Sequence, residues 1–309
     1  MKILLTSTSF QDTPGKHHYL LNSKGFEIDM IRGPVKADVL LPIIHQYDGV
    51  ICGDDEYSAE VLNAGKNGKL RVLSKYGIGL DKIDLKAAKD LGILVTNCIG
   101  VNHTTVAEHV FALLLSYCKQ IPYAVQHTRN GEWLRKTGIE IRGKTIGIIG
   151  LGKIGKEVAL RSLAFGMHVH AFDARPDYDF IQSHGIVFHT SPDEMIPLCD
   201  ILSLHLNLDE STRHIIDAKR FFYMKEEVII VNTARGELID QSALIERLEA
   251  NTKMAYLTDV LDQEPMPIHH PLYKFNQVFI TPHIGSRTFE SVERQGIMAV
   301  ENLINNLSI

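Results

Sequence analysis

Three residue types suited to proton and hydride transfer follow short apolar runs in the second half of this 309-residue chain: Arg235, Glu264 and His283. The planar fork of an arginine matches a carboxylate. A histidine exchanges a proton near neutral pH, and a nearby carboxylate would fix its tautomer and keep it protonated. Hydride transfer to a 2-keto acid needs a cation for the carboxylate, an acid for the carbonyl oxygen and a partner for that acid. The three residues match those needs.

Each residue also has a purely structural interpretation. Arg235 precedes a glycine and could be a surface arginine in a turn, Glu264 could be a solvated loop acid, and His283 is one of 15 histidines. Their common position favours the chemical interpretation, because each comes after a predicted strand, and open α/β sheets bind ligands at the carboxyl ends of their strands.

A glycine-rich turn precedes these segments. Residues 144–149 read as a buried strand, Gly150, Gly152 and Gly155 follow in a G-x-G-x-x-G pattern, and a helix is predicted over 157–165. The first glycine permits a tight turn, the second lets the backbone approach a pyrophosphate, and the third lets the helix pack closely on the strand. Any α/β turn could be rich in glycine, but the ordered context favours dinucleotide binding.

Asp173 ends the next predicted strand. Its carboxylate is placed to accept hydrogen bonds from the adenosine ribose, and it would repel a 2′-phosphate. The sequence therefore predicts NAD rather than NADP as the cofactor, although Arg175, two residues on, could soften that preference.

Strands and helices alternate along the chain, which predicts an α/β fold with two parallel sheets. Strands are expected at 3–6, 26–31, 47–52, 71–74 and 93–96, and again at 145–149, 168–172, 185–188, 201–204, 228–231, 255–258 and 278–280. Helices are expected at 37–45, 58–64, 85–91, 101–121 and 287–306, with Gly25, Gly65 and Gly92 at helix ends. Segment 123–142 reads as polar and irregular and holds Trp133.

Composition narrows the class of protein. The net charge of −5 and pI near 6.3 argue against nucleic-acid binding. No apolar run approaches the roughly 20 residues of a membrane span, and the N-terminus lacks a signal-peptide core. The four cysteines show no C-x-x-C spacing, so we expect buried thiols, no metal site and a cytoplasmic protein. They are Cys52, Cys98, Cys118 and Cys199.

The chain resembles the D-2-hydroxyacid dehydrogenase family over nearly its whole length, and most closely its phosphoglycerate-dehydrogenase-like branch. The resemblance is carried by the glycine loop with Asp173 and by segments 75–81, 106–109, 204–206, 232–236, 259–265, 270–272 and 281–285.

The resemblance implies roles for individual residues. Arg235 would hold the substrate carboxylate and carbonyl, His283 would be the acid/base, and Glu264 its partner. Backbone groups of the loop at residues 76–79 would bind the carboxylate. The cofactor contacts implied are Gly150, Gly152, Lys153, Ile154, Gly155, Asp173, His205, Thr233, Ala234, Arg235, Asp259, His283 and Gly285, and the substrate contacts are Lys75, Tyr76, Gly77, Ile78, Arg235 and His283.

The family fold is two Rossmann-like domains, a flavodoxin-like substrate domain and an NAD-binding domain, with the active site in the cleft between them. The substrate domain would comprise residues 1–99 and 284–309, and the NAD domain residues 100–283. Members are commonly homodimers through the NAD domain, and segment 123–142 resembles the dimer arm. No regulatory domain is expected after Ile309.

Departures from the family pattern bear on the substrate. Around Asp54 and Asp55 the chain lacks the arginine that many relatives use for a distal phosphate, and Asn207 replaces a common proline. Lys75 could supply a positive charge for a second anionic group, or it could be a solvated lysine.

Two other functions stay open: an NAD(H)-sensing regulatory protein of the same fold, and a formate- or phosphite-type dehydrogenase. The presence of Arg235, Glu264 and His283, with a proline directly after the glutamate, favours a hydroxyacid dehydrogenase over a formate dehydrogenase.

Overall fold

The structure, a computed structural model, describes residues 1–307 and divides into two compact units. Unit 1 comprises Met1–Asn102 and the C-terminal segment from Ser286, and unit 2 comprises His103–Gly285. Each unit holds one parallel sheet, which confirms the predicted fold class. The predicted substrate domain ends at residue 309, so its last two residues lie outside the described part.

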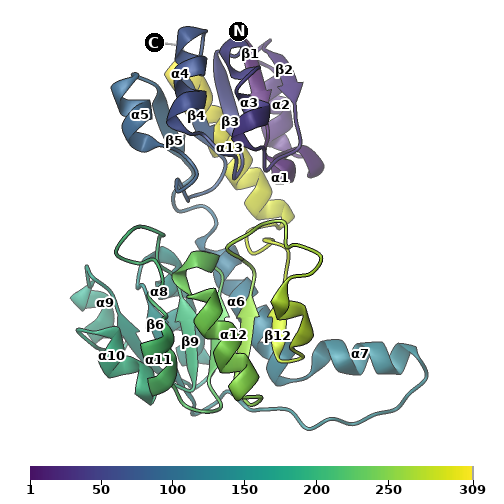
Figure 1. Ribbon diagram of the computed structural model, residues 1–309, viewed down its shortest axis with the longest axis vertical. Coiled ribbons are helices and arrows are strands. Elements are labelled where there is room, and N and C mark those ends of the chain that lie inside the picture. Colours follow the sequence, from purple (N-terminus) through teal and green to yellow (C-terminus); the bar gives the residue numbers. More distant parts are fainter. Residues whose placement is uncertain (308–309) are drawn as a thin grey trace. The chain divides into compact units, whose positions relative to one another are not determined.

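Unit 1 is built on a five-stranded parallel sheet in the order β2-β1-β3-β4-β5 (Figure 1). All five predicted strands are present, as β1 (Lys2–Leu5), β2 (Glu27–Met30), β3 (Gly49–Cys52), β4 (Val72–Lys75) and β5 (Leu94–Asn97). The strands β1, β3 and β4 are almost wholly buried, as expected for parallel strands covered on both faces.

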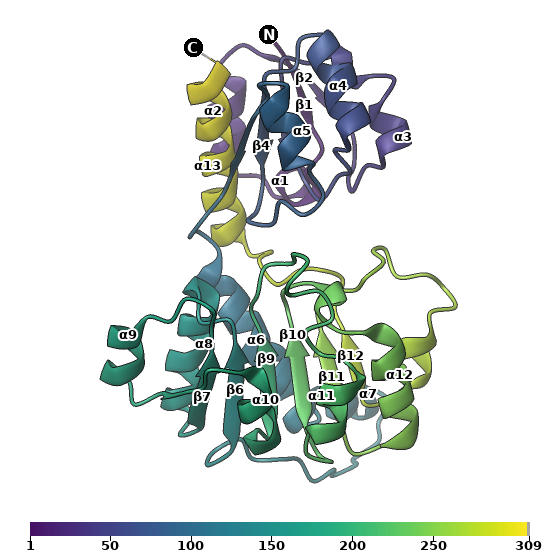
Figure 2. The same cartoon turned by 60° about the vertical axis from the view of Figure 1, so that its left-hand side comes forward.

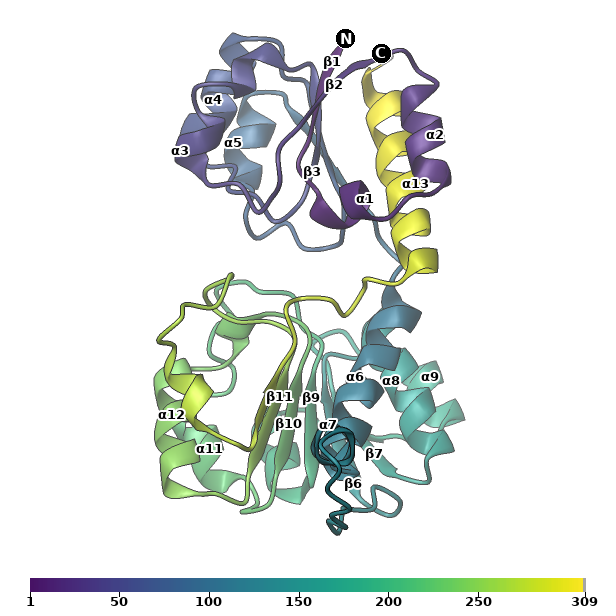
Figure 3. The same ribbon diagram turned by 90° about the vertical axis from the view of Figure 1, so that its right-hand side faces the viewer.

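Helices cover both faces of this sheet, and one of them comes from the far end of the chain (Figure 3). One face carries α1 (Thr8–Asp12), α2 (Lys16–Asn22) and α13 (Phe289–Leu307), and the other α3 (Ala37–Leu40), η1 (Ile44–Gln46), α4 (Ala59–Asn67) and α5 (Leu85–Asp90). Val300 and Leu303 of α13 are fully buried against strand residues such as Ile3. The terminal helix is therefore part of the core of unit 1.

Unit 2 is built on a seven-stranded parallel sheet in the order β12-β11-β10-β9-β6-β7-β8 (Figure 2). The strands are β6 (Thr145–Ile149), β7 (His168–Phe172), β8 (Val187–Phe188), β9 (Ile201–Leu204), β10 (Ile229–Asn232), β11 (Ala255–Thr258) and β12 (Val278–Ile280), so all seven predictions are confirmed. The strand order reverses between β6 and β9, which is the point where sheets of this kind bind nucleotides.

The helices of unit 2 again form two layers (Figure 3). One apolar layer packs α6 (His103–Cys118), α8 (Lys153–Ala164) and α9 (Tyr178–Ser183) on the sheet. The other packs α10 (Pro192–Met195), η2 (Ile196–Leu198), α11 (Ala218–Tyr223), η3 (Gly236–Leu238), α12 (Gln241–Ala250) and η4 (Pro271–Lys274). Both faces of every central strand are thereby removed from water.

Several local predictions are wrong. The helix expected over 101–121 ends at Cys118, and a second helix, α7 (Ile121–Arg129), occupies part of the segment expected to be irregular. Gln120 adopts a left-handed conformation (φ 55°), which breaks the chain direction, and Pro122 sits in the first turn of α7, where proline is tolerated. Gly65 lies inside α4 and packs beside Leu70, so Gly68 caps that helix instead.

Candidate active site

The loops that follow the strands of the unit 2 sheet leave it at one edge, because all seven strands are parallel. The loops after β6, β9, β10, β11 and β12 carry the predicted functional residues Gly150, His205, Arg235, Glu264 and His283, respectively. The carboxyl edge of the unit 2 sheet is therefore the candidate site within that unit.

The glycine loop after β6 has the geometry that a dinucleotide requires. Gly150 has a φ of 99°, and a Cβ there would lie 2.7 Å from the carbonyl oxygen of His205. A Cβ on Gly155 would clash with the Gly150 carbonyl, whereas a Cβ on Gly152 would meet no atom within 4 Å among the described residues. Helix α8 begins at Lys153, so its first N–H groups face the open space beside Gly152. This cradle fits a pyrophosphate.

Asp173 lies at the end of β7, beside the same loop. Its Oδ2 accepts a hydrogen bond from the Leu151 N–H at 2.6 Å, and its Oδ1 accepts one from the Arg175 N–H at 2.7 Å. The carboxylate thus braces the glycine loop. Its position at the sheet edge fits the predicted contact with a ribose.

His205 follows β9 at the reversal of strand order. Its Nε2 lies 2.8 Å from the Ser203 hydroxyl, and its backbone N–H donates to the Ile149 carbonyl. Burial lowers the pKa of His205 to about 3. The ring is therefore neutral at physiological pH and unsuited to donate a proton to substrate.

The loop after β10 presents Arg235. The Asn232 side chain fixes this loop, since its Nδ2 donates to the Arg235 carbonyl at 2.8 Å and its Oδ1 accepts from the Ala234 N–H at 3.1 Å. Arg235 Nη1 donates to the Ala234 carbonyl at 2.8 Å. The Thr233 hydroxyl is buried without a hydrogen-bond partner among residues 1–307. An orphaned polar atom of this kind is costly and fits a site completed by a bound group.

His283 and Glu264 meet as the sequence predicts. Nδ1 of His283 lies 2.7 Å from Oε2 of Glu264, and Oε1 of Glu264 accepts from the Leu261 N–H at 2.8 Å. Their side chains are about one-third exposed, at 36% and 33% respectively. The carboxylate orients the imidazole through Nδ1, which makes Nε2 the ring atom suited to proton exchange with a substrate.

Asp259, at the end of β11, organises the loop that carries His283. Its carboxylate accepts hydrogen bonds from the Ile284 N–H (2.9 Å), the Gly285 N–H (2.6 Å) and the Thr281 hydroxyl (2.5 Å). The side chain is almost fully buried. Gly285 has to be small here, because a Cβ would lie 2.8 Å from the Asp259 carboxylate.

Sequence reasoning missed one residue of this network, His109 on α6. Its Nε2 lies 3.0 Å from the Thr281 hydroxyl and 3.3 Å from Asp259 Oδ1. The residue belongs to segment 106–109, one of those that carry the family resemblance, but its spacing in sequence gave no sign that it reaches the loop after β12.

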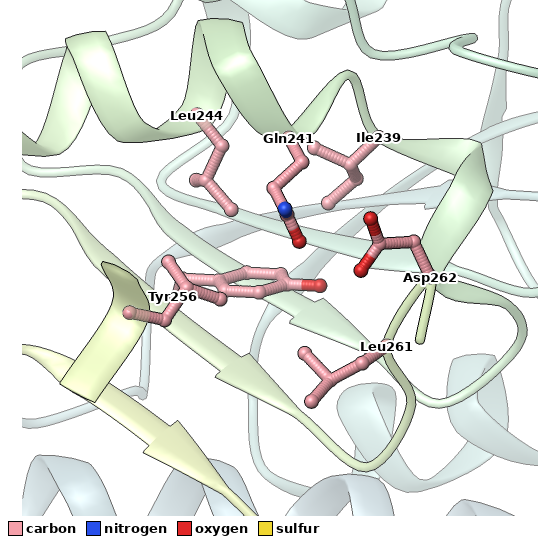
Figure 4. Close-up of a pocket in the computed structure, with 8 residues that line it drawn as sticks. Ile239, Gln241, Leu244, Tyr256, Leu261 and Asp262 are labelled. Carbon is pink, nitrogen blue, oxygen red and sulfur yellow. The ribbon is translucent and has the colours of Figure 1, made fainter. Parts of the chain in front are cut away.

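The enclosed space behind these loops is too small to be the site. A cavity of about 10 Å³, room for one water molecule, lies between α12 and the segments after β10 and β11 (Figure 4). Its lining residues are Gly236, Ile239, Gln241, Leu244, Tyr256, Leu261, Asp262 and Leu272. This cavity is therefore not a candidate for the site.

The predicted substrate loop after β4 lies in unit 1. Lys75 is not a solvated lysine, since its side chain is only 4% exposed and its Nζ donates to the Gly53 carbonyl and to Asp54 Oδ1, each at 2.6 Å. Tyr76 is buried, with a hydroxyl that has no partner within the described residues. Gly77 turns the chain at a φ of 122°, and the Ile78 carbonyl accepts from the Asn97 side chain.

Asp55, next to Asp54, is held inside unit 1. It is fully buried, and its oxygens accept from the Thr6 hydroxyl and from the N–H groups of Val35 and Gly53. Burial raises the pKa of this carboxyl, although the hydrogen bonds oppose that effect.

All four thiols are free and buried, as predicted. Within residues 1–307, no group of three or more potential ligands could hold a metal ion, and no helix is long and apolar enough to cross a membrane.

This fold and edge define a class, the NAD-dependent oxidoreductases built from two parallel-sheet domains. The profile of the family described as "D-isomer specific 2-hydroxyacid dehydrogenase, NAD binding domain" matches residues 111–285. The chain belongs to the D-isomer specific 2-hydroxyacid dehydrogenase family. It is an NAD-dependent enzyme of the class that acts on CH–OH donors, as the sequence predicts.

The chain is similar to several named proteins and to solved structures. It is 39% identical over 289 residues to a hydroxypyruvate reductase of Thermotoga maritima, which covers 92% of each protein. It is 34% identical over 288 residues to a D-3-phosphoglycerate dehydrogenase of Archaeoglobus fulgidus, covering 92% of this chain but only 54% of that protein. A crystal structure of a protein from Thermus thermophilus matches with a TM-score of 0.88 at 35% identity, covering 100% of this chain and 97% of that one.

Proposed function

We propose that this chain reduces small 2-keto acids with a single negative charge, such as glyoxylate and hydroxypyruvate, to D-2-hydroxy acids. The observation that carries the proposal is the ion pair between Lys75 and Asp54. Lys75 was the only residue that the sequence offered for a second anionic group. Its ammonium is buried and already paired with the Asp54 carboxylate, so it is not available to a second anionic group of a substrate.

The similar proteins also favour a substrate with a single negative charge. The hydroxypyruvate reductase matches this chain along nearly its full length, whereas the chain spans about half of the phosphoglycerate dehydrogenase. A substrate with a hydroxyl in place of a phosphate needs no second cation.

The residues of unit 2 have separate tasks in this mechanism. NADH, when bound, supplies the hydride from its nicotinamide ring. Arg235 binds the substrate carboxylate through its guanidinium and polarises the carbonyl. His283 delivers a proton from Nε2 to the carbonyl oxygen, while Glu264 stabilises the imidazolium through Nδ1. Asn232 keeps the Arg235 loop rigid during these steps.

Finer features belong to the same proposal. The N–H groups of residues 76–79 bind the substrate carboxylate, and the cofactor contacts are those predicted around Gly150, Asp173, His205 and Thr233. The division into a substrate domain and an NAD domain follows the predicted boundaries.

The protein is proposed to be a cytoplasmic homodimer. Helix α7 buries no residue, and apolar side chains lie exposed on it and on the following segment: Ile121, Val125, Trp133, Leu134 and Ile139. An apolar surface of this kind is typical of an interface. Light scattering of the wild type and of Trp133→Ser measures the dimer, and cell fractionation measures the compartment.

NADH oxidation against a substrate panel tests the proposed function. The panel is glyoxylate, hydroxypyruvate, phosphohydroxypyruvate, 2-oxoglutarate and phosphonopyruvate. We expect kcat/KM to be at least about tenfold higher for the singly charged acids. Preference for the doubly charged acids would refute the substrate class, and no turnover with any of them would favour the NAD(H)-sensing function. Formate and phosphite oxidation tests the remaining alternative.

A charge variant sharpens the test. Asp54→Asn leaves the Lys75 ammonium without its carboxylate, so activity with phosphohydroxypyruvate should rise relative to hydroxypyruvate. Asp54→Glu keeps the charge and serves as the matched control, with an unchanged ratio.

A further inference from the structure

Helix α6 reaches the loop that carries His283 through one side chain. His109 is largely buried, with 15% of its side chain exposed. Its Nε2 lies within hydrogen-bonding distance of the Thr281 hydroxyl, at 3.0 Å, and near Asp259 Oδ1, at 3.3 Å. A carboxylate can only accept, so Nε2 carries the proton and donates toward both oxygens.

The Asp259 carboxylate holds the backbone on the far side of His283. Ile284 and Gly285 donate their N–H groups to its two oxygens, and Thr281 donates its hydroxyl. The residues on both sides of His283 therefore depend on one buried carboxylate. Its orientation is set by the groups around it, of which His109 is the one contributed by another element.

His283 itself has a backbone that needs support. Its φ is 53°, in the left-handed region that side chains rarely adopt. Its N–H donates to the Asp259 carbonyl at 3.0 Å, so Asp259 fixes the residue through the main chain as well. Strained conformations persist only where their surroundings hold them, and they gather at functional sites.

The charge of Asp259 is maintained despite its burial. Burial alone would raise the pKa of this carboxyl, but hydrogen bonds from His109, Thr281 and Ile284 lower it overall. The carboxylate therefore stays ionised, which keeps each of its hydrogen bonds charge-assisted and strong.

We propose that His109 is a positioning residue for the reaction: it anchors Asp259, and through it residues 281–285, so that His283 stays aligned with Glu264. The proposal rests on the proposed role of His283. His109 touches neither substrate nor the reacting atoms, and it acts only through the loop.

Three variants test the proposal. His109→Leu removes the donor, and His109→Gln places an amide N–H near the position of Nε2. His184→Leu is the matched control, because His184 also lies in unit 2 but, among residues 1–307, its ring hydrogen-bonds only to Phe180 and Ser183 of the helix that it caps.

We expect His109→Leu to lower kcat for hydroxypyruvate by about 10- to 100-fold, because a misplaced catalytic group lowers the rate of the chemical step. His109→Gln should recover most of the rate, and His184→Leu should match the wild type. Normal kcat in His109→Leu, or a loss that only follows its unfolded fraction, would overturn the proposal.

Hydrogen exchange separates this proposal from the proposed function. In His109→Leu, the amides of Ile284 and Gly285 should exchange about tenfold faster than in the wild type, with slow exchange restored in His109→Gln. This readout does not require turnover. Faster exchange in an enzyme that reduces no keto acid would refute the function and keep the anchoring, and unchanged exchange would refute the anchoring itself.

Discussion

The two units present the same architectural edge but use it differently. In each, parallel strands end at one edge in loops that carry charged side chains. In unit 1 the charged side chains pair with each other, as Lys75 and Asp54 do. In unit 2, Glu264 orients a histidine through only one of its two ring nitrogens, and Asn232 braces the loop of Arg235.

The difference teaches that a position at a strand end is not enough to identify a catalytic group. The two edges differ in the cation that is paired with a carboxylate: a buried lysine with Asp54 in unit 1, and a titratable, one-third exposed histidine with Glu264 in unit 2. Asp55 and Asp259 are both buried carboxylates at strand ends, yet burial raises the pKa of Asp55 while hydrogen bonds lower that of Asp259.

The largest expected effect comes from His283→Ala. Loss of the general acid should lower kcat by about 10²- to 10⁴-fold, with NADH affinity retained. Steady-state kinetics with hydroxypyruvate and an NADH titration measure the two quantities. Near-normal turnover of every active keto acid would show that His283 is not the general acid, and that the unit 2 edge does not differ from the unit 1 edge in this respect.

Arg235→Ala should come next. Loss of the bidentate contact should weaken substrate binding and turnover together, with kcat/KM lower by about 10²- to 10³-fold. Arg235→Lys keeps the charge but loses the fork, so it should recover only part of this loss. Full activity in Arg235→Lys would show that the charge alone matters.

A pH dependence of stability should follow from His205. The pKa of His205 is about 3 in the folded protein, compared with an ordinary value of 6.5. Between pH 6.5 and pH 3, His205 is therefore protonated in the unfolded state but neutral in the folded state. Stability is therefore lost as pH falls from about 6.5 toward 3. Denaturant unfolding of the wild type and of His205→Gln, which cannot titrate, should show a shallower loss in the variant. Burial lowers the pKa of His17, His18 and His170 too, so some loss should remain.

Lys75→Met should have the smallest effect on catalysis. Because the Lys75 ammonium is paired with Asp54, kcat/KM for hydroxypyruvate should stay within about threefold of the wild type, and Asp54, whose side chain is 46% exposed, should remain hydrated in the variant. A selective collapse of keto-acid turnover at unchanged stability would give unit 1 a catalytic cation.

Much of the fold, and the pairing of Glu264 with His283 in the candidate site, could be predicted from the sequence. Strands such as β6 and β10 follow from buried apolar runs, and the meeting of Glu264 with His283 follows from parallel strands that share an edge. Gln120 escaped prediction because its left-handed conformation has no strong sequence signal. The roles of Lys75 and His109 escaped because each depends on which side chain packs against it, and that is decided by tertiary structure.

The most direct test of the account follows the hydride itself. Wild-type protein is incubated with hydroxypyruvate and NADH that carries deuterium at both C4 positions of the nicotinamide, and the product is analysed by NMR and mass spectrometry. The expected product is D-glycerate with deuterium at C2, formed in step with NADH oxidation. Binding of NADH without any labelled glycerate or other labelled 2-hydroxy acid across the panel would contradict it.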